Sequence, residues 1–211
     1  MTYSIVCYDP VEMMFGVGVV SGSIAVGSRV PWARYPVGAV ATQAYTNPSL
    51  GPIILGYLSQ GIEPGEALYR ALATDPEPEK RQVAVIDGRG RKAVHSGLEI
   101  PFERGQHVTN NAVCIANLVV DPSLPRILCN VFEEEFPIHG LVDAILTALE
   151  EAEALGGDKR GDHSAALLVV GKTGYGEYYD KILDVRVDYD PDERPVKRLR
   201  EIIARLRGLE S

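Results

Sequence analysis

The most constraining feature of this sequence is that its strand-like segments come in runs and do not alternate one by one with helices. These apolar or alternating segments are residues 2–9, 14–20, 37–45, 82–87, 91–95, 112–120, 164–170 and 182–189. Turn signals such as Asp9-Pro10 and Gly88-Arg89-Gly90 join neighbouring segments directly, as in hairpins. Strands in runs favour antiparallel sheets over a doubly wound parallel sheet.

Helix-like segments lie between these runs as two pairs, and one more closes the chain. Apolar residues at helical spacing, flanked by Pro or Gly, predict helices at residues 48–60, 64–72, 122–135, 141–155 and 194–207. Asn47-Pro48 fits a helix start, and Gly61 and Gly156-Gly157 fit helix ends. We therefore predict an α+β fold, a four-layer α-β-β-α sandwich of two mainly antiparallel sheets with the helices outside. Because no linker-like change in composition occurs, we expect residues 1–211 to form a single domain.

The charge balance disfavours two classes of partner. With 21 Lys and Arg against 29 Asp and Glu, the net charge is −8, which makes the chain a poor candidate for binding nucleic acid or an anionic membrane. No run of 18 apolar residues predicts a membrane span, and the start MTYSIVCYDP lacks the pattern of a signal peptide. We expect a cytoplasmic protein.

The cysteines and histidines predict neither a metal site nor a disulfide framework. Cys7, Cys114 and Cys129 form no CxxC pair, and the four histidines show no HExxH arrangement. Since Cys7 and Cys114 lie in apolar runs, we expect reduced thiols that serve as small core residues. The acidic run at residues 188–192 lacks the glycine and glutamate of a calcium loop. No metal and no cofactor is therefore predicted.

Two glycine-containing stretches resemble nucleotide-binding motifs without meeting their requirements. Gly16-Val17-Gly18 lies inside a predicted strand and has the wrong spacing for a dinucleotide fingerprint. Gly171-Lys172-Thr173 follows a buried strand, but the first glycine of a P-loop and the helix after it are missing. Neither stretch predicts a phosphate site.

Thr2 is the sharpest candidate for chemistry. Aminopeptidases readily remove an initial methionine when the second residue is small, and removal of Met1 would leave a hydroxyl and a free α-amine on one residue. A threonine hydroxyl becomes a nucleophile when a base takes its proton, and an α-amine with a pKa of about 7.7–8.0 can act as that base. The alternative is that Met-Thr is an ordinary start with no role.

Five blocks of the sequence together resemble one uncharacterised family, domain of unknown function 1028. The blocks are MTYSIVCYDP, FGVGVVSGSIAVGSRVPWA, GAVATQAYTNPSLGP, GGDKRGDHSAALLVV and YYDKILDVRVDYDP. They occur in the family's order and cover nearly the whole chain. The resemblance implies an Ntn-hydrolase-like fold, an α-β-β-α sandwich whose enzyme members use an N-terminal Thr, Ser or Cys.

The resemblance also implies a set of site residues. Thr2 is the implied nucleophile, and the candidates for substrate binding or oxyanion stabilisation are Ser21, Ser23, Gln43, Asn117, Asp158, Arg160 and Ser164. Side-chain amides and hydroxyls can donate hydrogen bonds to an oxyanion, and an arginine can hold a carboxylate. Structural roles remain open: Asp158 as a turn cap, Ser164 as a strand start and Asn47 as a helix cap. The roles of Asp162 and His163 stay open as well.

These observations lead to one leading hypothesis and two rivals. The leading one is an Ntn-type amidohydrolase that uses Thr2 after removal of Met1 and acts on a small-molecule substrate of unknown identity. One rival is a non-catalytic protein of the same fold that binds a small metabolite. The other is a self-assembling protein, since the apolar segment 24–32 could form an interface. A homo-oligomer is expected, without nucleic-acid or membrane partners.

Overall fold

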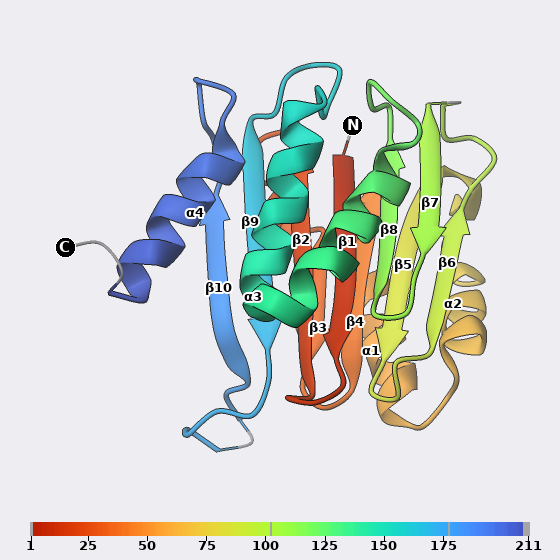
Figure 1. The fold of residues 1–211 in the computed structure, drawn as a ribbon. Coiled ribbons are helices and arrows are strands. Elements are labelled where there is room, and N and C mark those ends of the chain that lie inside the picture. The colour runs from red at the N-terminus through yellow and green to blue at the C-terminus, as the bar shows by residue number, and fades with distance from the viewer. Residues whose placement is uncertain (1, 102, 177, 209–211) are drawn as a thin grey trace.

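The strands form two antiparallel sheets in the computed structural model, which describes residues 2–101, 103–176 and 178–208 (Figure 1). The six-stranded sheet has the order β10-β9-β2-β1-β8-β7, and the four-stranded sheet has the order β3-β4-β5-β6. The first contains β1 (Thr2–Asp9), β2 (Met14–Ser21), β7 (Arg104–Val108), β8 (Ala112–Asn117), β9 (Ser164–Val170) and β10 (Lys181–Val187). The second contains β3 (Pro31–Arg34), β4 (Gly38–Ala44), β5 (Arg81–Asp87) and β6 (Lys92–Ser96).

Helices cover the outer face of each sheet, so that three apolar clusters separate four layers (Figure 1). The helices are α1 (Leu50–Ser59), α2 (Pro64–Leu72), α3 (Leu124–Ala154) and α4 (Pro195–Leu206), and two short 3₁₀ turns are η1 (Val26–Ser28) and η2 (Pro78–Lys80). α3 and α4 pack on the six-stranded sheet, and α1 and α2 pack on the four-stranded sheet. The cluster between the sheets contains no residue from these four helices.

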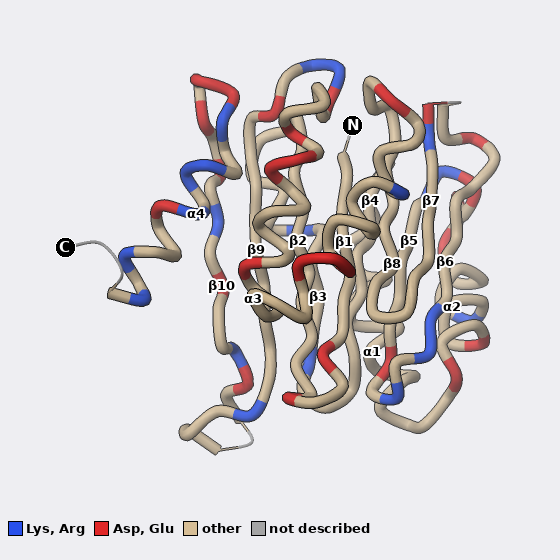
Figure 2. The backbone as a smooth tube through the Cα atoms, in the orientation of Figure 1, with Lys and Arg blue, Asp and Glu red and all other residues tan. Residues whose placement is uncertain are grey.

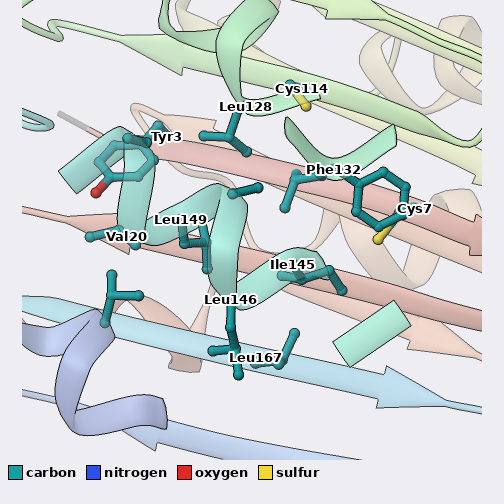
Figure 3. Packing of buried hydrophobic residues seen from close by; sticks show 14 of the residues in the cluster. Tyr3, Cys7, Val20, Cys114, Leu128, Phe132, Ile145, Leu146, Leu149 and Leu167 are labelled. Atoms are coloured by element: carbon teal, nitrogen blue, oxygen red, sulfur yellow. The ribbon is translucent and has the colours of Figure 1, made fainter. Parts of the chain in front are cut away.

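The alternation of side chains along β1 shows how the central strand serves two clusters. Tyr3, Ile5 and Cys7 belong to the cluster under α3, and Figure 3 shows Tyr3 and Cys7 in that cluster. Val6 and Tyr8 belong to the cluster between the sheets. Since successive side chains of a strand point to opposite faces, Thr2 and Ser4 must point with Val6 toward the second sheet.

The Gly16-Val17-Gly18 stretch has a packing role. A Cβ atom on Gly16 would lie 2.5 Å from Ile145 Cδ1, and one on Gly18 would lie 2.6 Å from Ile145 Cγ2. Glycine at both positions therefore allows α3 to approach β2 closely.

The predicted class is confirmed as a mixed α+β fold, with two antiparallel sheets and four helices among the described residues. Each predicted strand segment overlaps an observed strand, but β3 and β7 were not predicted. The two helices predicted at 122–135 and 141–155 form one run, α3, with non-helical backbone at Gly140 (φ 77°). The predicted break at Gly140 is therefore present as a kink.

The predicted start of the first helix at Asn47-Pro48 is wrong by two residues, because α1 begins at Leu50. Asn47 instead accepts a hydrogen bond from the Ser49 backbone N–H at 3.1 Å and donates one to Asp75 Oδ2 at 2.8 Å. It thus ties the start of α1 to the connection that follows α2.

The expectation of reduced thiols at Cys7 and Cys114 is wrong for Cys114. Cys114 on β8 and Cys129 on α3 form a disulfide, with their Cα atoms 5.9 Å apart. Cys7 is a free and fully buried thiol, as expected, and burial raises its pKa well above the usual value. Spacing along the sequence did not reveal the pair, since β8 and α3 come together only in the folded chain.

The helices of the described residues include none with the length and apolar character needed to cross a bilayer.

Candidate functional site

A row of polar side chains lies across four adjacent strands of the six-stranded sheet at one end. Thr2 on β1 pairs with Asn117 on β8, and Ser21 on β2 pairs with Ser164 on β9. The β1–β2 register, which pairs Tyr3 with Val20, continues to bring Thr2 beside Ser21. The row therefore reads Ser164, Ser21, Thr2, Asn117 across β9, β2, β1 and β8.

The side chains of this row point into the layer between the sheets. Their strand neighbours two positions away are Val19, Ile115 and Ala166, which all belong to the apolar cluster of that layer. On the facing sheet, Gln43 of β4 and Gln82 of β5 pair with each other and have the same orientation, next to Ala41 and Ala84. One end of an otherwise apolar layer is thus polar.

The Thr2 hydroxyl is held at the centre of this row. Its Oγ1 atom lies 3.0 Å from Ser21 Oγ, and Ser21 Oγ accepts the Ser23 backbone N–H at 3.1 Å. Ser164 Oγ donates to the Ser23 carbonyl at 2.5 Å and accepts the Val26 N–H at 3.2 Å. The hydroxyls therefore fix the loop after β2 against the start of β1. Thr2 is 7% exposed.

The second part of the site is an amide cluster, which we define as Gln43, Gln82 and Asn117. Gln82 Oε1 accepts hydrogen bonds from Gln43 Nε2 at 2.8 Å and from Asn117 Nδ2 at 3.1 Å. Gln43 Nε2 also donates to the Thr2 carbonyl at 3.2 Å, and Ser4 Oγ donates to Gln43 Oε1 at 2.6 Å. The amide cluster is buried and contacts the backbone of the candidate nucleophile directly.

The loop between α3 and β9 completes the site from above the strand ends. Asp158 Oδ2 accepts the Gly22 N–H at 2.6 Å, and the Asp158 carboxylate also pairs with the Arg160 guanidinium at 3.1 Å. Arg160 Nη2 donates to Ser23 Oγ at 3.3 Å, and its side chain is 45% exposed. Figure 2 shows basic and acidic residues side by side in this loop, at the end of the molecule that holds the N-terminus.

A buried carboxyl supports this loop from the α3 side of the sheet. Asp162 Oδ2 accepts the Tyr3 hydroxyl at 2.8 Å, and Oδ1 accepts the Asp158 N–H at 3.1 Å. Burial raises the pKa of Asp162 to about 6, and burial together with Asp162 raises the pKa of Tyr3 well above its usual value. His163 donates its backbone N–H to the Ser21 carbonyl, and its ring lies near Tyr189.

The structure brings all eight predicted site residues to this end of the molecule. Thr2, Ser21, Ser23, Ser164, Asp158 and Arg160 form one hydrogen-bonded set, and Gln43 and Asn117 join it through the amide cluster. Sequence reasoning missed Gln82 and Ser4. The available signal was a polar residue inside an apolar strand, QVAVID for Gln82 and TYSIVCYD for Ser4.

The described residues hold no group of three or more His, Cys, Asp or Glu side chains arranged to bind a metal ion. The chemistry that the site offers is a hydroxyl next to side-chain amide N–H donors. Such a set can attack a carbonyl carbon and stabilise the negative charge that develops on its oxygen.

A cavity of about 790 Å³ opens elsewhere, between α1, the β3–β4 turn and the loop before β10. Tyr35, Pro52, Leu55 and Tyr178 line it, and none of the predicted site residues does. The Tyr35 N–H donates to Asp180 Oδ2 at 2.8 Å on one side of this cavity.

The chain resembles other proteins over nearly its full length. The crystal structure of protein SPO2555 from Silicibacter pomeroyi, described with the family model DUF1028, has a TM-score of 0.85 and 26% sequence identity to this chain, with 97% of this chain and 85% of that chain covered. No curated protein matches the chain. The model for the Family of unknown function (DUF1028) matches residues 2–199, and the chain therefore belongs to this family.

Proposed function

We propose that this protein is an amidohydrolase of the Ntn type, with Thr2 as its nucleophile after removal of Met1. The main observation behind this proposal is the position of the Thr2 hydroxyl. It lies 3.0 Å from Ser21 Oγ, at the same end of the sheets as the side-chain amide donors. The order of the layers, with two antiparallel sheets between helices, also supports an Ntn-hydrolase-like sandwich. A nucleophile at the first position of a central strand suits that architecture.

The reaction would begin with the α-amine of Thr2 accepting the proton of the Thr2 hydroxyl. With a pKa of about 7.7–8.0, such an amine is substantially neutral near physiological pH and can take this role. Thr2 Oγ1 then forms a bond to the carbonyl carbon of an amide substrate, and the carbonyl electron pair moves to oxygen. Asn117, which lies opposite Thr2 on β8, supplies an amide N–H for this oxyanion.

Breakdown of this intermediate gives an ester on Thr2. The ammonium of Thr2 returns its proton to the leaving nitrogen as the carbon–nitrogen bond breaks, so an amine leaves. Water, deprotonated by the same amine, then attacks the ester and releases the carboxylic acid, which restores the Thr2 hydroxyl. No cofactor or metal enters this scheme.

The proposed substrate follows from this chemistry, and the other partners and the location follow from the sequence. We propose a small amide-bearing molecule as substrate, a homo-oligomeric assembly and a cytoplasmic location, without nucleic-acid or membrane partners. Arg160, at the exposed side of the site, is the group suited to a substrate carboxylate.

The experiment is a mass measurement on protein that was expressed without a tag at the N-terminus. The intact mass should lack one methionine, and a β-lactone probe should add once, with the adduct mapped to Thr2. Thr2→Ala should abolish the adduct while Met1 is still removed, because alanine is also small, and Thr2→Ser should retain it. Loss of the Thr2–Ser21 hydrogen bond should cost about 1 kcal/mol of stability, so Thr2→Ala stays folded.

A retained Met1 without any adduct would contradict the proposal. The same would follow if Thr2→Ala reacted with the probe as fast as the wild-type protein. Either result would favour the two rival hypotheses, a metabolite-binding protein or a self-assembling protein.

A further inference from the structure

Gln82 has an amide whose orientation is determined by backbone carbonyls. Its Nε2 atom lies 3.2 Å from the Gly105 carbonyl and 3.1 Å from the Ala116 carbonyl. Since a carbonyl oxygen can only accept, this end of the amide must be the N–H donor, and Oε1 must face the other way. Ser96 agrees with this orientation, because its hydroxyl donates to Gln106 Oε1 and its oxygen accepts from Gln82 Nε2 at 3.0 Å.

The orientation of Gln82 fixes that of its two neighbours. Gln82 Oε1 is an acceptor 2.8 Å from Gln43 and 3.1 Å from Asn117, so both must present their nitrogen. Gln43 confirms this independently, because its nitrogen also faces the Thr2 carbonyl and its oxygen accepts from Ser4. A flipped Gln43 would place its oxygen against two other oxygens. The three buried amides thus have one consistent arrangement.

We infer that Gln82 is a positioning residue, which holds the Asn117 amide with its nitrogen in the layer beside Thr2. Asn117 lies opposite Thr2 in the β1–β8 register, and one of its two N–H groups is used by Gln82. The acceptor on Gln82 thereby sets the plane in which the second N–H lies. The catalytic role of this arrangement rests on the proposed function, in which that N–H donates to the oxyanion. The orientation of the three amides does not depend on the proposed function.

The test compares three variants by two readouts. Gln82→Met keeps the length of the side chain and removes both polar ends, and Gln82→Glu keeps acceptors for the two amides. Gln60→Met is a matched control at the exposed residue that follows α1. The first readout is the NMR signals of the Gln43 and Asn117 side-chain NH₂ groups and their hydrogen exchange with water. The second is the rate at which a β-lactone probe acylates Thr2 in protein that lacks Met1.

In Gln82→Met we expect the NH₂ signals of Gln43 and Asn117 to shift, their exchange to accelerate, and acylation to slow by roughly tenfold or more. Gln82→Glu should keep the acylation rate within about threefold of the wild type although it is less stable, since its carboxyl group faces two carbonyls. Gln60→Met should change neither readout. The two acylation rates distinguish a positioning role from an effect of stability. Both Gln82 variants are less stable than the wild type, but only Gln82→Met lacks the oxygen that accepts from Gln43 and Asn117.

Unchanged NH₂ signals in Gln82→Met would overturn the inference, as would an acylation rate equal to that of the wild type with the signals shifted. If Gln82→Met does not fold, Gln82→Glu decides, and a loss of acylation of tenfold or more in folded Gln82→Glu would count against the inference. Wild-type protein that gives no adduct would refute the proposed function alone. The NH₂ signals of Gln43 and Asn117 in Gln82→Met would then still test whether Gln82 orients the two amides.

Discussion

Gln43 and Gln82 are completely buried, although water would solvate their amides well. Burying a polar group without a partner costs about 1–3 kcal/mol, and a satisfied hydrogen bond returns only about that amount. Apolar residues at these two positions alone would leave the Asn117 amide, the Ser4 hydroxyl and the Thr2 carbonyl without these partners and would destabilise the fold. Because the rest of the layer between the sheets is apolar, these polar residues are best explained by the groups that they orient.

Gly22 provides a prediction at the scale of one residue. A Cβ atom there would lie 2.7 Å from the Gly161 carbonyl and 2.8 Å from the Asp158 carboxylate, so alanine must displace the loop that bears Asp158. We expect Gly22→Ala to lower the free energy of unfolding by about 1–3 kcal/mol and to slow acylation of Thr2. Denaturant unfolding and the probe assay measure the two effects.

Gly56→Ala is the matched control for this prediction. Gly56 lies within α1, and a Cβ atom there meets nothing within 4 Å, so alanine should raise stability by up to about 1 kcal/mol. A Gly22→Ala protein with wild-type stability and reactivity would contradict the tight fit of Gly22 against Asp158.

The separate residues of the site were predictable to different degrees. The resemblance of sequence blocks named Thr2, Ser21 and Ser164, and the strand register places their side chains in one row. Gln82 belongs to no block, and nothing in a single strand sequence says that its amide faces Asn117 on the other sheet. Contacts across two sheets depend on how the sheets stack, which periodicity does not encode.

At the scale of elements, the strands that the sequence analysis missed are short strands at sheet edges. β3 has four residues, of which Pro31 is the first, and Pro36 follows it closely, whereas β7 (RGQHV) lacks the apolar alternation of a half-buried strand. Edge strands need less burial than central ones, so their hydrophobic signal is weak. The central strands, which are buried on both faces, have the strongest signal and were all predicted.

The disulfide between β8 and α3 gives a prediction at this scale. Cys114 and Cys129 are 15 residues apart, and closing a loop of that length should stabilise the fold by about 3 kcal/mol. Alkylation of the protein under denaturing conditions without reductant, followed by mass measurement, should label one thiol, which is Cys7. Reductant should lower the melting temperature of the wild type and leave Cys114→Ala/Cys129→Ala unchanged. Three free thiols, or no effect of reductant, would contradict the disulfide.

At the scale of the whole molecule, the two ends of the strands differ in character. The end with Thr2 combines buried hydroxyls and amides with a charged loop, and the 790 Å³ cavity lies by the β3–β4 turn, among residues outside that set. The polar strand residues of the Thr2 end follow ordinary strand alternation, yet six strands contribute them. The site therefore depends on the complete stacking of both sheets, and element order alone could predict its layers but not its contacts.

The raised pKa values of Asp162 and Glu153, near the Thr2 end of the strands, predict how the stability of the whole molecule changes with pH. Burial raises the pKa of Asp162 to about 6 and that of Glu153 to about 7, both above their values in an unfolded chain, about 3.9 and 4.3. The folded state thus binds these protons more tightly, and the stabilisation is complete below about pH 4 and lost as the pH rises through 6 and 7. For Asp162 the loss should be roughly 2–3 kcal/mol.

We therefore expect the free energy of unfolding, measured in denaturant at pH 5, 6, 7 and 8, to fall as the pH rises. Asp162→Asn should flatten this slope, since an asparagine can still accept the Asp158 N–H and donate to the Tyr3 hydroxyl but carries no titrating charge. It should be more stable than the wild type at pH 8 and closer to it at pH 5. Glu153→Gln should remove the part of the slope nearest pH 7, with a smaller effect because its side chain is only partly buried. A free energy of unfolding that rises with pH would show that the folded state does not favour the protonated carboxyl. The same would follow if the pH dependence were unchanged in Asp162→Asn.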